Sequence, residues 1–284
     1  MTKQKQAVSI QDISCIGRCS LTVALPILSA AGIATAIVPT AILSTHTGGF
    51  KDYTFRDLTD DIMPIAKHWL TENIEFDAIY TGYLGSFEQI EIVKQFFKLF
   101  RKENTLIYVD PAMADNGKLY AGFTPEFALK MGELCAQADV IVPNITEACF
   151  MLGEPYQEGP YTEEYIDGLL DRLAEKIGAP QIVLTGVMYD KEKIGAAIYD
   201  TRTGKKGYAF THYLPYSMHG TGDVYASAVL GALMNGSNLQ DAAQIAADYT
   251  VESMEETYRT RDDLRYGVNF ETTIPSLLKA LGRI

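Results

Sequence analysis

Short apolar runs rich in β-branched residues alternate with longer amphipathic stretches through the first two thirds of the chain. The short runs are typical of buried strands and fall at residues 7–10, 34–39, 78–81, 106–109, 140–142 and 182–185. The longer stretches have apolar residues at helical spacing and fall at residues 55–70, 87–100, 125–136 and 163–177. Strands and helices that alternate in this way form a mainly parallel sheet with helices on both faces.

The pattern changes after residue 185. Two strand-like runs, at residues 195–199 and 206–212, flank a turn-forming stretch and predict a hairpin at a sheet edge. Further helices are expected at residues 222–234, 239–258 and 274–281. Because the chain has 284 residues and shows no internal repeat or linker, we expect one α/β domain spanning residues 1–284.

Composition narrows the class of partner. The formal net charge is −12, and no cluster of basic residues offers a surface for nucleic acid or an anionic membrane. No apolar run approaches the roughly 18 residues that cross a bilayer, and the polar N-terminus does not suggest a signal peptide. We therefore expect a cytoplasmic protein with four reduced cysteines and a small-molecule substrate, without nucleic acid or membrane partners.

The strongest chemical signal is Gly220-Thr221-Gly222-Asp223, which opens a helix of small apolar residues. The glycines allow a sharp turn, and the free amides at a helix start attract an anion. Asp223 suits a helix-start residue as well as a catalytic base, and spacing alone does not separate the two. The P-loop pattern that usually binds nucleotide phosphates does not occur in the sequence.

Two acidic motifs follow predicted strands, one with Asp110 and Asp115 and the other with Asn144 and Glu147. Carboxylate and amide oxygens suit Mg²⁺, which prefers oxygen ligands and keeps several waters. The structural alternatives are an ordinary Asp-Pro turn in the first motif and a helix start in the second, with Thr146 as its N-cap.

Polar segments also lie at the ends of the first three predicted strands and of the strand at residues 182–185. They are Ser9-Ile10-Gln11, Ser44-Thr45-His46-Thr47-Gly48-Gly49, Thr81-Gly82-Tyr83 and Thr185-Gly186-Val187. An aromatic ring with a few directional hydrogen-bond donors suits a flat aromatic substrate. Taken singly, each segment is also compatible with an ordinary strand end or turn.

In their order along the chain, these motifs resemble those of the pyridoxal kinases, within the ribokinase-like superfamily. The Gly-Thr-Gly-Asp helix start resembles the superfamily signature, and the N-terminal segments resemble Ser-Ile-Gln, Ser-Asn-His-Thr and Thr-Gly-Tyr of the pyridoxal kinases. Residues 110–115 resemble Asp-Pro-Val-Met-Gly-Asp but differ at two positions, and residues 17–20 depart from the family's Gly-x-Val-Gly-Asn pattern. The resemblance implies a ribokinase-like three-layer α/β sandwich.

The resemblance also implies roles for particular residues. The implied catalytic residues are Asp223, as the base for the substrate hydroxyl, with Gly220, Thr221 and Gly222 around the transferring phosphoryl group. The implied substrate-binding residues are Ser9, His46, Thr47, Tyr83 and Asp223. The implied nucleotide-binding residues are Asp110, Asp115, Asn144, Glu147, Thr185, Gly220 and Gly222. The implied magnesium-associated residues are Glu147, Asp115 and Asp110.

The implied reaction is the ATP-dependent phosphorylation of the 5′-hydroxymethyl group of pyridoxal, pyridoxine or pyridoxamine by a homodimer that uses Mg²⁺. A requirement for K⁺ or Na⁺ and the order of preference among the three vitamers stay open. One alternative is a hydroxymethylpyrimidine kinase, although that family more often has Cys at the position of Asp223. Others are a sugar or nucleoside kinase of the same fold and an ATP-binding regulator without turnover.

Overall fold

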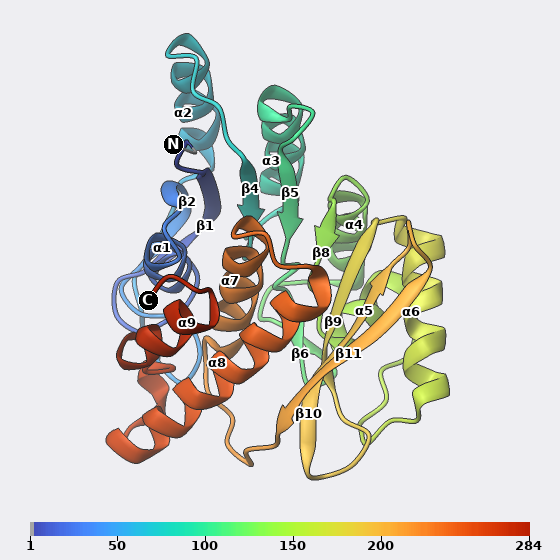
Figure 1. The fold of residues 1–284 in the computed structure, drawn as a ribbon. Coiled ribbons are helices and arrows are strands. Elements are labelled where there is room, and N and C mark those ends of the chain that lie inside the picture. The colour runs from blue at the N-terminus through green and yellow to red at the C-terminus, as the bar shows by residue number, and fades with distance from the viewer. Residues whose placement is uncertain (1–2) are drawn as a thin grey trace.

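The computed structural model describes residues 3–284 and shows a nine-stranded, mainly parallel sheet between two layers of helices (Figure 1). The strands of this sheet are β1 (Gln6–Ser14), β2 (Ala34–Leu43), β3 (Phe55–Asp57), β4 (Ala78–Thr81), β5 (Leu106–Val109), β8 (Val140–Ile141), β9 (Gln181–Val187), β10 (Lys193–Asp200) and β11 (Lys205–His212). A separate two-stranded sheet pairs β6 (Ala114–Asp115) with β7 (Lys118–Leu119). The helices are α1 (Leu21–Ala30), α2 (Thr59–Thr71), α3 (Phe87–Phe100), α4 (Pro125–Cys135), α5 (Ile145–Leu152), α6 (Glu163–Ile177), α7 (Thr221–Met234), α8 (Leu239–Thr260) and α9 (Ile274–Ala280). The expected three-layer α/β sandwich is confirmed.

Each face of the sheet has its own apolar core. Helices α2 to α6 pack their apolar residues against side chains such as Val8 and Ile107 on one face. Helices α1, α7, α8 and α9 pack against side chains such as Ala7 and Tyr108 on the other. Consecutive residues of β1 and of β5 thus enter opposite cores, which is why these buried strands read as continuous apolar runs.

The order of strands reverses around β1. The sheet runs β11-β10-β9-β8-β5-β4-β1-β2-β3, and β1 pairs in parallel with both β2 and β4. The chain leaves β1 toward β2 and later continues from β4 in the opposite direction across the sheet. In open α/β sheets this switch point leaves a crevice beyond the carboxyl ends of the strands, where ligands bind.

The predicted hairpin is confirmed and lies at the sheet edge. Strand β10 pairs antiparallel with both β9 and β11, and β11 is outermost. Side-chain amides of α8 reach the backbone of β11: Gln240 donates to the Tyr208 carbonyl, and Gln244 Nε2 lies 3.1 Å from the Phe210 carbonyl oxygen. Helix α8 therefore satisfies part of this edge within the chain itself.

Three local expectations need correction. Residues 55–57 form the exposed strand β3 rather than the start of a helix, and α2 begins only at Thr59, whose amide donates to Asp57 Oδ1 over 2.7 Å. Strand β1 runs on to Ser14, beyond the expected end. Helix α1 was not expected, because Leu21–Ala30 is apolar almost throughout and contains Pro26. Among residues 3–284, no helix has both the length and the apolarity to cross a membrane.

Candidate active site

The start of α7 is shaped by Gly220. This residue is the helix N-cap and has a φ of 82°, the left-handed region that favours glycine. A Cβ at this position would collide with the carbonyl oxygen of Arg18, so the loop before α1 packs directly against the helix start. At Gly222, by contrast, a Cβ would meet no atom within 4 Å. The helix start thus has one side packed against protein and one side with free space, where its amides can meet an anion.

Asp223 lies in the first turn of α7, next to this free space. Burial raises the pKa of its carboxyl to about 7, and the negative charge of Asp12 adds to the rise. A hydrogen bond from the backbone of Ser20 partly opposes the shift. The carboxyl therefore exchanges its proton close to neutral pH, which suits a group that accepts a proton from a substrate.

Two more buried carboxyls approach Asp223 from the sheet. Asp110 follows the end of β5, its side chain is covered, and burial together with the charge of Asp223 raises its pKa well above the usual range. Asp12 lies on β1 at an irregularity of the β1–β2 pairing, and burial raises its pKa while Ser20 and Ser14 oppose the rise. Within residues 3–284, no Lys, Arg or His forms an ion pair with these three carboxyls. A bound cation would relieve their mutual repulsion.

Asn144 and Glu147 form a capping box at the start of α5. The Glu147 amide donates to Asn144 Oδ1 and the Asn144 amide donates to Glu147 Oε2, each over 2.9 Å. The N-cap is therefore Asn144, and the expectation of Thr146 as N-cap is wrong. Glu147 is buried, and its other oxygen, Oε1, accepts from the amide of Met113 over 3.0 Å. The motif thus holds the loop that follows β5.

That loop continues into the β6–β7 hairpin, which carries Asp115. Asn116 and Gly117 both have positive φ at the turn, and Asp115 accepts from the Asn116 amide over 2.8 Å. Burial raises the pKa of the Asp115 carboxyl, and the hydrogen bond from the Asn116 backbone and the proximity of His219 partly oppose the rise. Asp115 is nevertheless an exposed residue.

Thr185 joins the same edge of the sheet. It forms an isolated parallel bridge with Asn144, and its hydroxyl lies 3.4 Å from the Pro143 carbonyl oxygen. Next to it, Gly186 is exposed, and a Cβ there would meet no atom within 4 Å. The predicted nucleotide-side residues thus come from the ends of β5, β8 and β9 and the start of α7, at the carboxyl-end edge where parallel sheets bind ligands.

The predicted magnesium residues do not form a direct metal cage. Among residues 3–284, no group of three His, Cys, Asp or Glu side chains is arranged to hold a metal ion. Both Glu147 oxygens already accept backbone amides, whereas the Asp110 carboxyl has no cationic partner. Because Mg²⁺ keeps waters and takes phosphate oxygens in nucleotide sites, Asp110 with a few such ligands still fits the ion.

On the acceptor side, Ser9 is not placed as the sequence predicts. It lies within β1 rather than at its end, and its side chain is fully covered. Its hydroxyl accepts a hydrogen bond from Gln11 Nε2 over 3.0 Å. The hydroxyl is thus partly engaged within the protein, and the contact between Ser9 and a substrate ring stays a prediction.

His46 is also bonded within the protein. Its side chain is buried, with Nε2 2.5 Å from the Arg265 carbonyl oxygen and Nδ1 accepting from the Gly48 amide over 3.1 Å. Both ring nitrogens are therefore bonded to backbone groups of the protein, and the place of the His46 ring in a substrate pocket stays a prediction. Its ring also lies 4.9 Å from that of His219, centroid to centroid.

The substrate-binding roles of Tyr83 and Thr47 stay predictions. Tyr83 is half-buried and stacks on Phe123, with ring centroids 5.5 Å apart. Burial and the nearby charge of Asp12 raise the pKa of Tyr83 to about 12, which places it on the Asp12 side of the site. Thr47 is exposed on the loop that follows β2.

Three residues near Asp223 have no motif of their own. Burial raises the pKa of the partly buried Cys19 thiol, and the charges of Asp223 and Asp12 raise it further, so these three groups interact. Tyr80 lies between the sheet and α7, and its hydroxyl has no hydrogen-bond partner among residues 3–284. Burial raises the pKa of this hydroxyl, and the charges of Asp110 and Asp223 raise it further. In the sequence, the only sign that the surroundings of Asp223 differ from those in the pyridoxal kinases was the departure of residues 17–20 from the family pattern.

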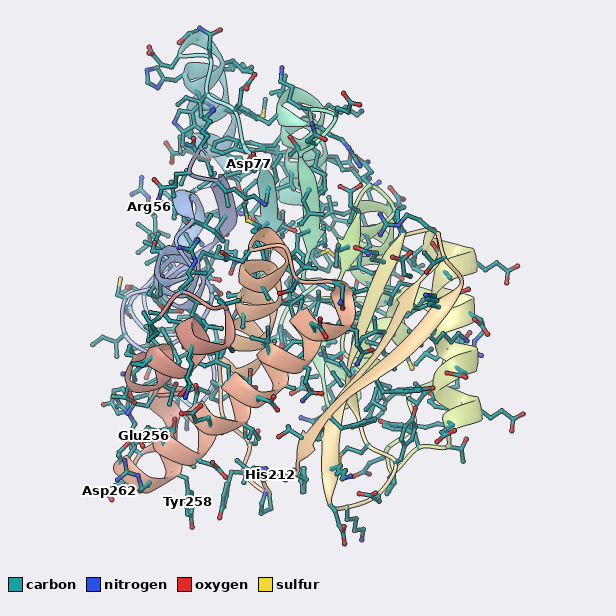
Figure 2. The ribbon with its side chains drawn as sticks, in the orientation of Figure 1. Arg56, Asp77, His212, Glu256, Tyr258 and Asp262 are labelled. Atoms are coloured by element: carbon teal, nitrogen blue, oxygen red, sulfur yellow. The ribbon has the colours of Figure 1, made fainter. Side chains whose placement is uncertain are left out.

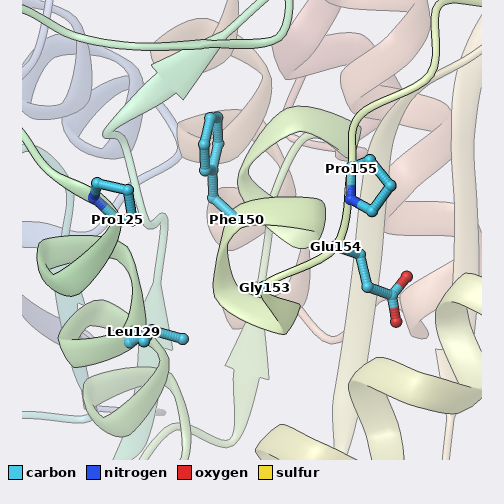
Figure 3. Close-up of a pocket in the computed structure, with 6 residues that line it drawn as sticks. All are labelled: Pro125, Leu129, Phe150, Gly153, Glu154 and Pro155. Atoms are coloured by element: carbon cyan, nitrogen blue, oxygen red, sulfur yellow. The ribbon is translucent and has the colours of Figure 1, made fainter.

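Two other surface features lie away from this set of residues. A cavity of about 300 Å³ between α4 and α5 is lined by Pro125, Leu129, Phe150, Gly153, Glu154 and Pro155 (Figure 3). None of these is a predicted site residue. His212, which has no evident partner in sequence, lies 2.8 Å from Glu255 at the α8 end that carries Tyr258 (Figure 2).

Comparison with known proteins gives consistent results. Residues 25–266 match the family model described as phosphomethylpyrimidine kinase. A Bacteroides thetaiotaomicron VPI-5482 protein described as a phosphomethylpyrimidine kinase, in a crystal form with pyridoxal, is 38% identical, with a TM-score of 0.91 over 97% of this chain and 96% of that one. Pyridoxal kinase from Lactobacillus plantarum is 32% identical, with a TM-score of 0.88 over 98% of each chain. Pyridoxine kinase from Bacillus subtilis (strain 168) is 28% identical over 66% of this chain and 68% of its own.

Proposed function

Because the chain belongs to the phosphomethylpyrimidine kinase family, we propose that its acceptor is a vitamin B6 vitamer. Within the ribokinase-like superfamily the chain is a relative of the pyridoxal kinases, and it is a phosphotransferase that acts on an alcohol group. The proposed reaction transfers the γ-phosphoryl group of ATP to the 5′-hydroxymethyl group of pyridoxal, pyridoxine or pyridoxamine. The observation that carries the proposal is Asp223, a carboxyl with a pKa of about 7 beside the open start of α7.

In the proposed reaction, Asp223 accepts the proton of the acceptor hydroxyl as its oxygen bonds to phosphorus and the bond to the ADP oxygen breaks. A hydroxyl loses its proton late in a loose transition state, so correct placement of the carboxylate matters more than high basicity. The backbone amides that follow Gly220 point along the axis of α7 and stabilise negative charge on the transferring group.

We propose Mg²⁺ as the cation on the donor side. Asp110 would hold it directly or through water, and Glu147 would act indirectly by fixing the loop at Met113. When bound, the ion would neutralise charge on the β- and γ-phosphates of ATP. The uncompensated Asp110 carboxyl next to Asp223 supports a cation at this place.

We also propose a cytoplasmic homodimer and leave open a K⁺ or Na⁺ requirement. The β10–β11 edge is not the argument for the dimer, because Gln240 and Gln244 already bond that edge. Light scattering of the purified protein would give a mass near twice 31.3 kDa for the dimer. A mass of one chain at all accessible concentrations would contradict it.

The second candidate is a hydroxymethylpyrimidine kinase. The likeness to hydroxymethylpyrimidine/phosphomethylpyrimidine kinase from Bacillus subtilis (strain 168) favours it. The same relative's crystal form with pyridoxal supports the B6 proposal. Both candidates share the acceptor chemistry, a hydroxymethyl group on a flat heteroaromatic ring, so only a comparison of acceptors separates them.

The test is ADP release by the purified protein with Mg-ATP and one acceptor at a time. The panel is pyridoxal, pyridoxine, pyridoxamine, hydroxymethylpyrimidine and ribose, with the Asp223→Asn variant as blank. We expect turnover with at least one vitamer at a kcat/KM well above that for the pyrimidine and ribose. Higher kcat/KM for the pyrimidine would overturn the acceptor, and ATP binding without turnover on any acceptor would favour a regulator.

A further inference from the structure

The loop at residues 44–50 is attached to a distant part of the chain, residues 263–267. His46 Nε2 lies 2.5 Å from the Arg265 carbonyl oxygen, across 219 positions of sequence. Because Nδ1 accepts from the Gly48 amide, Nε2 carries the ring proton and donates it to that carbonyl. The neutral imidazole is therefore a bridge that bonds its own loop with one nitrogen and the C-terminal segment with the other.

Aromatic contacts reinforce this bridge. Phe50 lies edge-on to the His46 ring at 5.0 Å and to the Tyr266 ring at 5.7 Å, centroid to centroid. The Arg265 guanidinium lies 5.3 Å from the centre of the Phe50 ring. The base of the loop is closed by a separate hydrogen bond, in which the Ser44 amide donates to the Thr54 carbonyl over 3.1 Å. The far end of the loop is thus held mainly through His46 and Phe50.

The C-terminal segment is itself fixed to the start of α7. The Arg18 amide donates to the Tyr266 carbonyl over 3.2 Å, and the Arg18 side chain pairs with Glu271 at 2.6 Å. Gly267 has a φ of 80°, and a Cβ there would meet Arg18 at 3.0 Å. The Arg18 carbonyl in turn packs against Gly220. A continuous set of contacts therefore runs from His46 to the helix start that carries Asp223.

The loop also touches the helix start directly. A Cβ on Gly48 would collide with the His219 imidazole, so this ring packs against the loop backbone. Thr47 lies between His46 and Gly48 and is exposed. A shift of the loop would therefore move Thr47 relative to His219 and α7.

We propose that His46 is a positioning residue: its bond to the Arg265 carbonyl holds Thr47 in place for the acceptor, and residues 263–267 thereby form part of the acceptor site. The inference rests on the proposed function for its kinetic test, since the acceptor is the substrate expected beside Thr47. It assigns the C-terminal segment a role in the site that no sequence motif indicates.

Two substitutions separate the two nitrogens. In His46→Gln the side-chain amide can still donate from the position of Nε2 to Arg265, whereas in His46→Asn the amide oxygen can still accept from Gly48 at the position of Nδ1. We expect His46→Gln to stay close to wild type. We expect His46→Asn to raise the acceptor KM about tenfold, with kcat and the KM for ATP little changed, because one buried hydrogen bond is lost. His68→Asn, at an exposed histidine of α2, is the matched control.

Amide hydrogen exchange of residues 44–50 in the full chain needs no substrate and keeps the two proposals apart. Faster exchange in His46→Asn, but not in His46→Gln, supports the bridge even if no vitamer is phosphorylated. If His46→Asn folds poorly, Gly267→Ala, which strains the segment at a positive φ, should give the same kinetic pattern.

Three outcomes would overturn the inference. His46→Asn could match wild type in both measurements. His46→Gln could be as defective as His46→Asn, which would show that ring packing matters and the bond to Arg265 does not. The acceptor KM could rise without any change in exchange, which would indicate direct contact between His46 and the acceptor.

Discussion

The start of α7 and the loop at residues 44–50 border the same candidate site, but they use their polar groups differently. At α7 the Asp223 carboxyl has a hydrogen bond from the Ser20 backbone but no ion pair with any of residues 3–284, and the helix start is open at Gly222. In the loop, both nitrogens of His46 are bonded to backbone groups. The start of α7 therefore keeps a charge without a counterion and amides that can bind a ligand. The two nitrogens of His46 instead stabilise the fold.

We expect this difference to separate residues that act on a ligand from residues that position other residues. A buried, uncompensated carboxyl is costly for folding, so its presence points to a role with a bound cation or substrate. A buried imidazole with two good hydrogen bonds is explained by the fold alone. Substitutions at the two regions should therefore differ in kind: loss of turnover at α7, and loss of acceptor affinity at the loop.

The largest expected effect is on turnover at Asp223. Asp223→Asn removes the proton acceptor and should lower kcat by about 10³-fold, while ATP still binds. Steady-state ADP release and calorimetric titration with ATP would measure the two quantities. Asp241→Asn, in the first turn of α8, is the matched control and should retain activity. Substantial turnover in a folded Asp223→Asn protein would place the proton acceptor elsewhere.

The next effect concerns Glu147, whose two carboxylate oxygens both accept backbone amides near the candidate site. In Glu147→Gln, an NH₂ group replaces one of two oxygens that accept backbone amides, so the loop at Met113 or the N-cap of α5 loses a bond. We expect kcat/KM for ATP to fall about tenfold or more, with a loss of about 1–3 kcal/mol in the free energy of unfolding. Glu126→Gln, at the exposed start of α4, is the control. Loss of activity at unchanged stability would instead indicate direct metal binding.

A third prediction concerns stability against pH in the ligand-free protein. The pKa of Asp223 rises from 3.8 in the unfolded chain to about 7 on folding. Between these values the folded state holds the extra proton, so the contribution of Asp223 to stability falls as pH rises and levels off above about pH 7. Asp223→Asn removes this penalty.

The variant should therefore be more stable than wild type at pH 8, on the order of 2 kcal/mol, and the advantage should vanish below about pH 4. Urea unfolding across this pH range would measure it. An advantage independent of pH would mean that the carboxyl is not desolvated in the folded protein.

The smallest effect is expected at Ser9. Ser9→Ala loses one hydrogen bond to Gln11, so stability should fall by about 1 kcal/mol while the acceptor KM stays near wild type. Thr47→Ala, at an exposed position of the acceptor loop, should change the KM more. Acceptor titrations of both variants would compare them. A larger KM increase in Ser9→Ala than in Thr47→Ala would restore Ser9 as a substrate contact.

The sequence alone predicted the alternating layers, the edge hairpin and the helix start at residues 220–223. The periodicity of apolar residues and the glycines around Asp223 are local features of the sequence. Local features of this kind determine helices, strands and turns largely without contacts from distant segments. The extent of one domain over residues 1–284 stays a prediction. The boundary at Thr59 was missed because residues 55–57 pair with β2, a contact between separate parts of the chain.

Only the tertiary structure showed which polar residues of these motifs already have partners within the protein. Ser9 and His46 fit a binding motif in sequence, but Gln11 and the Arg265 carbonyl occupy their polar atoms. Asp12 lacked a clear motif, yet burial beside Asp223 gives it a part in the site. The physical reason is that a buried hydrogen-bonding group must be paired, and a partner such as the Arg265 carbonyl, 219 positions from His46, comes near only on folding.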